Sequence, residues 1–304
     1  MPYDFLTNKK QSLLSPDPLK KPRLYTEVNR NKLTIDPKAL FLHEPPTNIG
    51  NVITYPFDSK YKIVTDGLSL YLDASYSSSY EGDGANWLDI SGNTNNFTLY
   101  NSPTFETNKL TFNINGAQQY AQCNNNTFGN YGSSSFTMEY FFNLATAPNT
   151  NNQYSTLFIK RGSSISIATA GTPGWTFNPG GNGYAGFISW MDSSGVPNTG
   201  VYRIDYSTSL IPENANTHII HTVQRNGLQV TGSWYKNGVF QSRIQHVSLG
   251  DGSFNNSVPA EVMRSPFIET YRSGSIYLIR SYDRSLSQSE ITQNYNATIG
   301  RLGL

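Results

Sequence analysis

Apolar and polar positions alternate in short runs from about residue 66 to the end of the chain. Residues 275–282 (SIYLIRSY), 135–144 (SFTMEYFFNL) and 155–161 (STLFIKR) are rich in β-branched or aromatic side chains, which is typical of strands. Asn-Gly pairs at residues 115–116, 226–227 and 237–238 favour the type I′ turns of antiparallel hairpins. The pattern therefore predicts an all-β fold, an antiparallel two-sheet jelly-roll sandwich.

One helix is expected, close to the C-terminus. Ser287 and Glu290 have the S-x-x-E spacing of a capping box, and Leu286 and Ile291 fit the hydrophobic staple around it. Gly300 is expected to end the helix. These signals predict one short helix around residues 291–295, directly after the last strand.

Composition supports the same fold class and limits the partners. Of the 304 residues, 13% are aromatic and 14% charged, and there are 20 Tyr, 25 Gly and 32 Asn; Tyr suits strands, whereas Asn and Gly suit turns. The net charge of +1 gives no reason to expect nucleic acid or an anionic membrane as a partner. Cys123 has no second cysteine to pair with, and neither an apolar leader nor a span of about 20 apolar residues occurs. We therefore expect folding in a reducing cytoplasm.

The first 65 residues differ from the rest and are predicted to form an extended arm, with the jelly-roll domain at residues 66–304. Residues 1–62 hold eight of the 16 Pro, and ten basic against six acidic residues give a net charge of +4. Pro pushes its predecessor toward extended conformations, and the recurring apolar side chains are unusual in disordered tails. We therefore expect the arm to anchor the domain to neighbouring subunits. The expected anchoring residues are Phe5, Leu13, Leu14, Lys20, Lys21, Arg23, Leu24, Tyr25, Leu40 and Phe41.

Several blocks of residues 66–304 carry a family resemblance. Residues 67–105 combine a Leu-rich strand ending in Asp-Ala with the turn motif WLDISGN, residues 221–238 supply a central hairpin, and residues 282–296 (YDRSLSQSEITQNYN) a closing strand and helix. Together they resemble the laminin-G-like, concanavalin-A-like jelly-roll domains found in bacteriophage and other viral structural proteins. The resemblance implies a fold used mostly for binding or for building surfaces. Residues 1–62 share no part of it.

Two small-ligand sites are candidates within the domain. Asp73, Asp83 and Asp89 border or lie in a long Gly- and Ser-rich loop and could hold calcium, which takes carboxylate and carbonyl oxygens. The alternative is that they are loop acids, with Asp89 accepting backbone N–H bonds in its turn; no other cofactor is expected. Trp175 and its neighbours are the candidates for contact with a sugar, and the alternative is that these rings pack in or beside the core. The candidate sugar contacts are Trp175, Tyr184 and Trp190.

No catalytic site is expected. Retaining glycoside hydrolysis needs two carboxyl groups about 5 Å apart, and no E-x-D-x-x-E motif occurs. His218 and His221 share a predicted strand, but a spacing of three turns them to opposite faces, so they cannot ligate one metal ion. The chain is therefore predicted to be non-enzymatic.

Three functions compete. The first is a virion structural protein, either a capsid-decoration, minor-capsid or tail-associated protein, assembled in the host cytoplasm. In this hypothesis the arm binds major capsid or tail subunits, and the protein forms a homo-oligomer in the particle. The second is a lectin-like receptor or adhesion module that binds a host-surface glycan. A glycan hydrolase is a distant third.

Overall fold

The computed structural model describes residues 62–113, 118–145, 156–161, 173–179, 211–227, 229–246, 253–266 and 269–302, and the backbone alone of residues 185–190 and 201–206. The chain divides into two units, residues 1–55 and residues 56–304, and every described residue belongs to the second. The predicted arm lies, up to residue 61, outside the described residues. The arm and the boundary at residue 66 therefore stay predictions.

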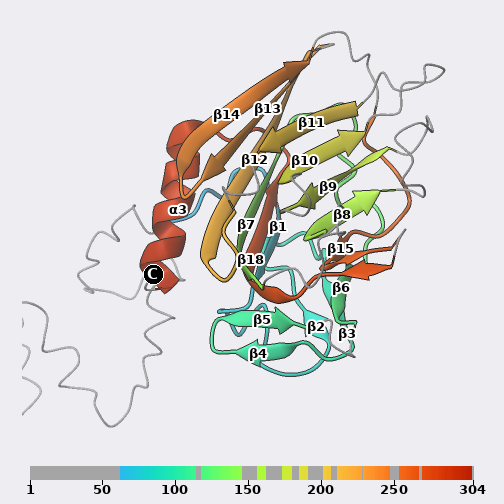
Figure 1. Ribbon diagram of the computed structural model, residues 1–304, viewed down its shortest axis with the longest axis vertical. Coiled ribbons are helices and arrows are strands. Elements are labelled where there is room, and N and C mark those ends of the chain that lie inside the picture. Colours follow the sequence, from blue (N-terminus) through green and yellow to red (C-terminus); the bar gives the residue numbers. More distant parts are fainter. Residues whose placement is uncertain are drawn as a thin grey trace, which may run out of the picture. The chain divides into compact units, whose positions relative to one another are not determined.

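Two antiparallel sheets form a sandwich, as predicted (Figure 1). Sheet A has the strand order β14-β13-β12-β7-β18-β5-β4, and β1 pairs with β18 as well. Sheet B has the order β11-β10-β9-β8-β15-β6-β3-β2. The strands of sheet A are β1 (Leu68–Asp73), β4 (Thr104–Glu106), β5 (Lys109–Phe112), β7 (Phe136–Leu144), β12 (Asn216–Asn226), β13 (Gln229–Lys236), β14 (Val239–His246) and β18 (Gly274–Tyr282). Those of sheet B are β2 (Asn86–Trp87), β3 (Phe97–Tyr100), β6 (Tyr120–Cys123), β8 (Phe158–Arg161), β9 (Gly174–Asn178), β10 (Ala185–Trp190), β11 (Val201–Tyr206) and β15 (Glu261–Val262). A separate hairpin joins β16 (Arg264–Ser265) to β17 (Thr270–Tyr271), and α3 (Gln288–Leu302) follows β18.

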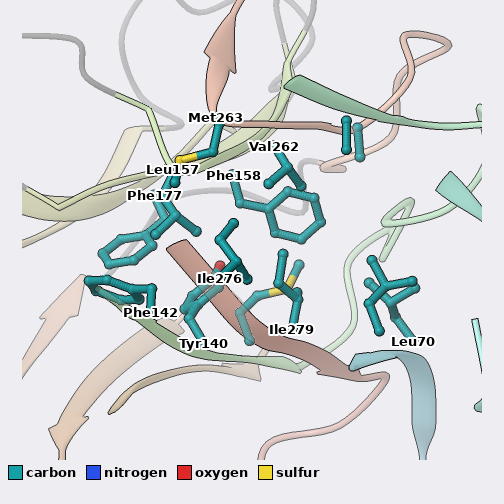
Figure 2. Packing of buried hydrophobic residues seen from close by; sticks show 14 of the residues in the cluster. Leu70, Tyr140, Phe142, Leu157, Phe158, Phe177, Val262, Met263, Ile276 and Ile279 are labelled. Carbon is teal, nitrogen blue, oxygen red and sulfur yellow. The ribbon is translucent and has the colours of Figure 1, made fainter. Parts of the chain in front are cut away.

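The main core lies between the two sheets. Alternation in β7 sends Met138, Tyr140 and Phe142 toward sheet B, where they join the buried apolar cluster. The ring of Tyr140 stacks on that of Phe177, with the ring centres 4.6 Å apart. Figure 2 shows the same meeting of the sheets, with Phe158, Phe177 and Val262 of sheet B above Tyr140, Phe142, Ile276 and Ile279 of sheet A.

The other face of sheet A is covered by α3 (Figure 1), so β7 is buried on both faces. A second, smaller apolar cluster fills part of this interface. Its members are Val64, Leu68, Ile220, Tyr235, Tyr282, Leu286 and Ile291.

A charged network occupies the rest of the interface beneath α3. Oε1 of Glu139 accepts a hydrogen bond from Arg280 Nη1 at 2.8 Å and lies 2.9 Å from His218 Nε2, while Oε2 accepts one from Asn294 Nδ2 at 2.8 Å. Arg280 also donates to Thr298 Oγ1 at 3.0 Å, and all five side chains are buried. Burial raises the pKa of Glu139, but the Arg280 charge and the bonds from His218 and Asn294 outweigh it and hold that pKa below its ordinary value. Because two members belong to α3 and three to sheet A, the network fixes the helix on the sheet.

The two strand histidines face opposite sides of β12, as predicted. His218 belongs to the charged network. His221 lies in the core, where its ring centre is 4.8 Å from that of Phe177 and 6.0 Å from that of Tyr140. Burial lowers the pKa of His221 to about 3, so this side chain is neutral at physiological pH.

The start of α3 confirms the predicted capping box, whereas its length corrects the prediction. The backbone N–H of Ser287 donates to Glu290 Oε2 at 2.8 Å, and the N–H of Glu290 donates back to Ser287 Oγ at 3.4 Å. The helix does not end at Gly300 but continues to Leu302. The reason is tertiary: Arg301 Nη2 donates to Asp73 Oδ2 of β1 at 2.6 Å, and this ion pair holds the last turn in helical form.

The predicted Asn-Gly turns have different outcomes. Asn237 and Gly238 form the two-residue loop between β13 and β14, with φ of 51° and 76°, as a type I′ turn requires. Asn226 is instead the last residue of β12 and pairs with Gln229, so it does not take the predicted position in the turn. The pair at residues 115–116 lies outside the described residues.

Candidate functional site

Alternation in sheet B brings a group of polar and aromatic side chains to its outer face. In β3, β6 and β15, the side chains of Leu99, Ala121 and Val262 enter the core. Their neighbours in sequence must therefore point outward. The strand register places Tyr100 opposite Tyr120, and Gln122 opposite Glu261. We call the set Tyr100, Tyr120, Gln122, Glu261, Arg264 and Tyr271 the tyrosine–arginine cluster.

Three rings form the apolar part of the cluster. Tyr100 and Tyr120 stack face to face, with ring centres 4.5 Å apart and planes 3° from parallel. Tyr271 lies 6.2 Å from Tyr120 and is tilted by 57°. Tyr100 is 36% exposed, which is high for an aromatic side chain, because Tyr120 covers only one of its two ring faces. Of the three rings, that of Tyr100 is the most exposed.

Arg264 joins the rings to the polar part of the cluster. Its guanidinium carbon lies 4.7 Å from the ring centre of Tyr120 and 5.8 Å from that of Tyr271, which is within range of cation–π attraction. Nη1 of Arg264 lies 3.3 Å from Glu261 Oε1, and the side chain is 19% exposed. The rings and the carboxylate hold the guanidinium in place at the surface.

Glu261 is the buried member of the cluster. Its Oε1 accepts hydrogen bonds from Gln122 Nε2 at 2.9 Å and from Arg264 Nη1 at 3.3 Å. Burial raises the pKa of Glu261 above its ordinary value, and the Arg264 charge and the Gln122 bond oppose this shift without cancelling it. The Glu261 carboxyl, the Arg264 guanidinium and the tyrosine rings thus lie on one face of the domain, with Tyr120 between Tyr100 and Arg264.

Such a combination suits a ligand with both apolar faces and hydroxyl groups. Aromatic rings provide a flat apolar surface, and planar polar side chains fix orientation. This site was not predicted from the sequence, because its residues come from five strands spread over 172 positions of the chain. The only signal in the sequence was the placement of Tyr100 and Tyr120 at outward positions of two alternating runs.

Trp175, predicted to touch sugar, is instead a core residue. It lies on β9, is fully buried, and packs edge-on against Phe158 with ring centres 4.8 Å apart. Its indole N–H donates to the carbonyl of Gly129 at 3.1 Å. Because no part of the ring reaches the surface, the predicted sugar contact is wrong for this residue. Tyr184 and the side chain of Trp190 lie outside the described residues, and their assignment stays a prediction.

The candidate calcium ligand Asp73 is committed to other partners. It is fully buried, its Oδ2 accepts from Arg301 and from the hydroxyl of Tyr71, and its Oδ1 accepts from Ser75. Asp83 is exposed in its loop. Across the described part of the chain, no three His, Cys, Asp or Glu side chains gather closely enough to hold a metal ion. The three candidate aspartates are therefore not brought together.

Asp89 has the role of a turn-former, as its position in the turn motif indicated. Its Oδ1 accepts from the backbone N–H groups of Tyr71 and Ser91, both at 2.9 Å, and its Oδ2 accepts from that of Asn95 at 2.9 Å. Three backbone donors satisfy both carboxylate oxygens, so the side chain stabilises the turn between β2 and β3.

The predicted anchoring residues of the arm, from Phe5 to Phe41, all lie outside the described residues. Where the chain enters the domain, the backbone is bound to the helix: Val64 N donates to Asn294 Oδ1 at 2.8 Å, and the carbonyl of Lys62 accepts from Gln293 Nε2 at 2.8 Å. These two bonds join the backbone of residues 62 and 64 to α3. No helix of the described residues is long and apolar enough to cross a membrane.

Several solved structures share this fold. The binding domain of Paraclostridial Mosquitocidal Protein 1 has a TM-score of 0.54 at 16% identity, covering 77% of this chain and 53% of that one. The binding domain of botulinum neurotoxin serotype D has a TM-score of 0.52 at 14% identity over 78% and 52% of the two chains. The receptor binding domain of botulinum neurotoxin type G has 0.51 at 12% over 77% and 52%. The chain thus spans about half the length of these neighbours.

These neighbours are binding domains and not catalytic ones. At such low identity, the likeness establishes the sandwich fold alone, and it gives no support to the viral part of the family resemblance. No protein-family model and no curated protein matches the chain.

Proposed function

We propose that this protein is a non-enzymatic carbohydrate-binding module, which attaches to a surface glycan through the tyrosine–arginine cluster. The observation that carries the proposal is the exposed ring of Tyr100, which ends a stack in which Tyr120 lies between it and the Arg264 guanidinium. Sugars present C–H faces that stack on aromatic rings and hydroxyls that bond to planar polar groups. The fold class supports the proposal, since the structural neighbours are themselves receptor-binding or binding domains.

Replacing Tyr100 and Tyr120 together by Ala is expected to reduce glycan binding at least ~10-fold, because an aromatic hot spot contributes about 2 kcal/mol or more and 1.4 kcal/mol is tenfold. The measurement is binding of the intact protein to an array of oligosaccharides, followed by titration with the best binder. Tyr277→Ala is the matched control, since this partly exposed tyrosine lies on β18 of the other sheet and its hydroxyl bonds to Asn216. Equal binding by the double variant and the control would exclude the cluster as the site.

The placement of the acidic groups supports a non-enzymatic role. The charged cluster around Glu139 is buried beneath α3. In the tyrosine–arginine cluster, Glu261 is paired with a guanidinium and not with a second carboxylate. We therefore expect the protein to bind oligosaccharides without cleaving them.

The virion structural role is the second candidate, and the Pro-rich arm with its spaced apolar side chains is the feature that favours it. An arm that docks onto capsid or tail subunits would place the carbohydrate-binding domain on the outside of a particle, so the two proposals are compatible. Spaced anchors on one tether add through effective concentration, and each buried apolar side chain contributes about 1.5–3 kcal/mol. A homo-oligomer in the particle would multiply weak contacts with a glycan in the same way.

Deleting residues 1–61 is expected to abolish assembly into oligomers or particles while leaving the glycan-binding profile unchanged. The cut spares Lys62 and Val64, whose backbone groups bind α3, so the domain should stay folded. Light scattering measures the oligomeric state, and the oligosaccharide array measures the glycan-binding profile. Both measurements use the same preparations. Loss of glycan binding with normal folding would assign recognition to the arm, and unchanged assembly would remove the arm's anchoring role.

A further inference from the structure

The contacts of the tyrosine–arginine cluster form a closed cycle that begins and ends at Tyr100. In one direction, the Tyr100 ring stacks on Tyr120 at 4.5 Å, and the Arg264 guanidinium lies 4.7 Å from the Tyr120 ring centre. Nη1 of Arg264 then lies 3.3 Å from Glu261 Oε1. In the other direction, the Tyr100 hydroxyl lies 3.5 Å from Gln122 Oε1, and Gln122 Nε2 donates to Glu261 Oε1 at 2.9 Å. We call these two routes to Glu261 the stacking arm and the hydroxyl arm.

The stacking arm is the stronger of the two. Its two tyrosine rings are only 3° from parallel, and Arg264 is also held by Tyr271, its partner across the β16–β17 hairpin. Hydrogen bonds between oxygens are ordinarily about 2.5–3.0 Å long, so the 3.5 Å contact of the Tyr100 hydroxyl adds little. The orientation of the exposed Tyr100 ring therefore depends mainly on Arg264, and through Arg264 on Glu261.

Glu261 contributes poorly to stability. Its side chain is only 3% exposed, and its Oε2 has no hydrogen-bond partner in the described part of the chain. Burying an ionised oxygen without a donor is unfavourable. Burial accordingly raises the pKa of Glu261, and neither the Arg264 charge nor the Gln122 bond cancels the shift. A carboxyl group whose pKa is raised by folding makes the fold less stable as the pH rises through that pKa. An apolar side chain of the same length would therefore serve the fold at least as well.

We infer that Glu261 is a positioning residue of the sugar site: through Arg264 and the stacked rings it holds Tyr100 in one orientation, without touching the saccharide itself. The inference rests on the proposed carbohydrate-binding function and names the residue that organises the site. A surface side chain loses rotamer freedom when a ligand orders it, and a ring that is fixed beforehand avoids this loss. The buried carboxylate improves binding in this way at the expense of stability.

The test measures oligosaccharide affinity by calorimetric titration, and the denaturant midpoint of unfolding, on the same variants of the full chain. Glu261→Met keeps the length of the side chain but removes both acceptor oxygens. We expect it to bind the best oligosaccharide of the array about 2- to 10-fold more weakly, the factor that ordering one side chain costs. Its midpoint at neutral pH should be no lower than that of the wild type. Glu261→Gln keeps an amide oxygen that can accept from Arg264 and Gln122, so it should restore most of the affinity.

Glu106→Met is the matched control, since Glu106 is an exposed glutamate of sheet A that pairs with Lys109. It should leave the affinity unchanged.

A double-mutant cycle tests whether Glu261 acts through Tyr100. In a Tyr100→Ala background no ring remains to be positioned, so adding Glu261→Met should not weaken binding further. Arg264→Ala breaks the stacking arm and should reproduce the loss seen in Glu261→Met. Gln122→Ala breaks only the hydroxyl arm and should lose less.

The outcomes separate this inference from the function on which it rests. Normal affinity of a folded Glu261→Met variant would overturn the inference, as would an equal loss from Glu261→Met with and without Tyr100. A lower midpoint together with weaker binding that Glu261→Gln does not restore would assign Glu261 a structural role instead. If Glu261→Met does not fold, Arg264→Ala takes its place in the cycle and decides. Normal binding by Tyr100→Ala, or no binding by the wild type, would remove the proposed function itself.

Discussion

Replacing Glu139 by Ala is expected to lower the free energy of unfolding by about 3–5 kcal/mol, the cost of leaving a buried partner charge uncompensated. The change removes the acceptor of Arg280, His218 and Asn294 at once. Since domains are commonly stable by only about 5–15 kcal/mol, this is a large share of the total. Guanidinium-induced unfolding of the purified protein measures it.

Glu106→Ala is the control for the loss of a glutamate. Its carboxylate lies 3.1 Å from Lys109 Nζ with 50% of the side chain exposed, and exposed ion pairs contribute about 0–1 kcal/mol. A loss of about 1 kcal/mol or less in Glu139→Ala as well would contradict the role given to the network. Replacing Glu139 and Arg280 together by Leu and Met should recover much of the loss, because no unpaired charge remains.

Replacing Trp175 by Ala is expected to lower the free energy of unfolding by about 3–5 kcal/mol, as for large aromatic side chains in other cores. The ring fills space between Phe158 and Gly129, and its N–H bond to the Gly129 carbonyl is lost as well. Thermal or denaturant unfolding measures the change. Any loss of glycan binding by Trp175→Ala should result from unfolding of the variant. Binding should therefore be normal at temperatures where the variant is folded.

Tyr100→Ala is the opposite control, because this ring is at the surface. It should reduce glycan binding while changing stability by little more than its stacking on Tyr120, about 0.5–1.5 kcal/mol. A native Trp175→Ala variant that had lost all glycan binding would restore Trp175 as a sugar contact.

The parts of the fold that were predictable from sequence depend on short-range patterns. β18 and β7 are rich in aromatic and β-branched side chains, and the capping box at Ser287 needs only four neighbouring residues. The end of α3 was not predictable in this way. Gly300 is a local stop signal, but the ion pair between Arg301 and Asp73 joins residues 228 positions apart and overrides it.

The site was harder to predict, because it too depends on contacts between residues far apart in the sequence. Trp175 stands among Gly and Pro residues, which indicated a loop, although the alternation of Trp175 with Phe177 already fitted a strand with one face in the core. The tyrosine–arginine cluster depends on strand order and register, which pair Tyr100 with Tyr120 and Gln122 with Glu261. Neither is encoded in a local motif.

The Glu139 network also shows why buried charge is a poor guide to function here. A glutamate, an arginine and a histidine meet within hydrogen-bond distance, yet α3 closes the site from solvent. The network stabilises the position of the helix, whereas the tyrosine–arginine cluster on sheet B is partly exposed.

The most direct test of the account is a structure of the protein with the tightest-binding oligosaccharide from the array. We predict a sugar ring packed against the exposed ring of Tyr100. A saccharide bound at residues 173–190, at any other surface, or at no defined place on the protein would contradict it.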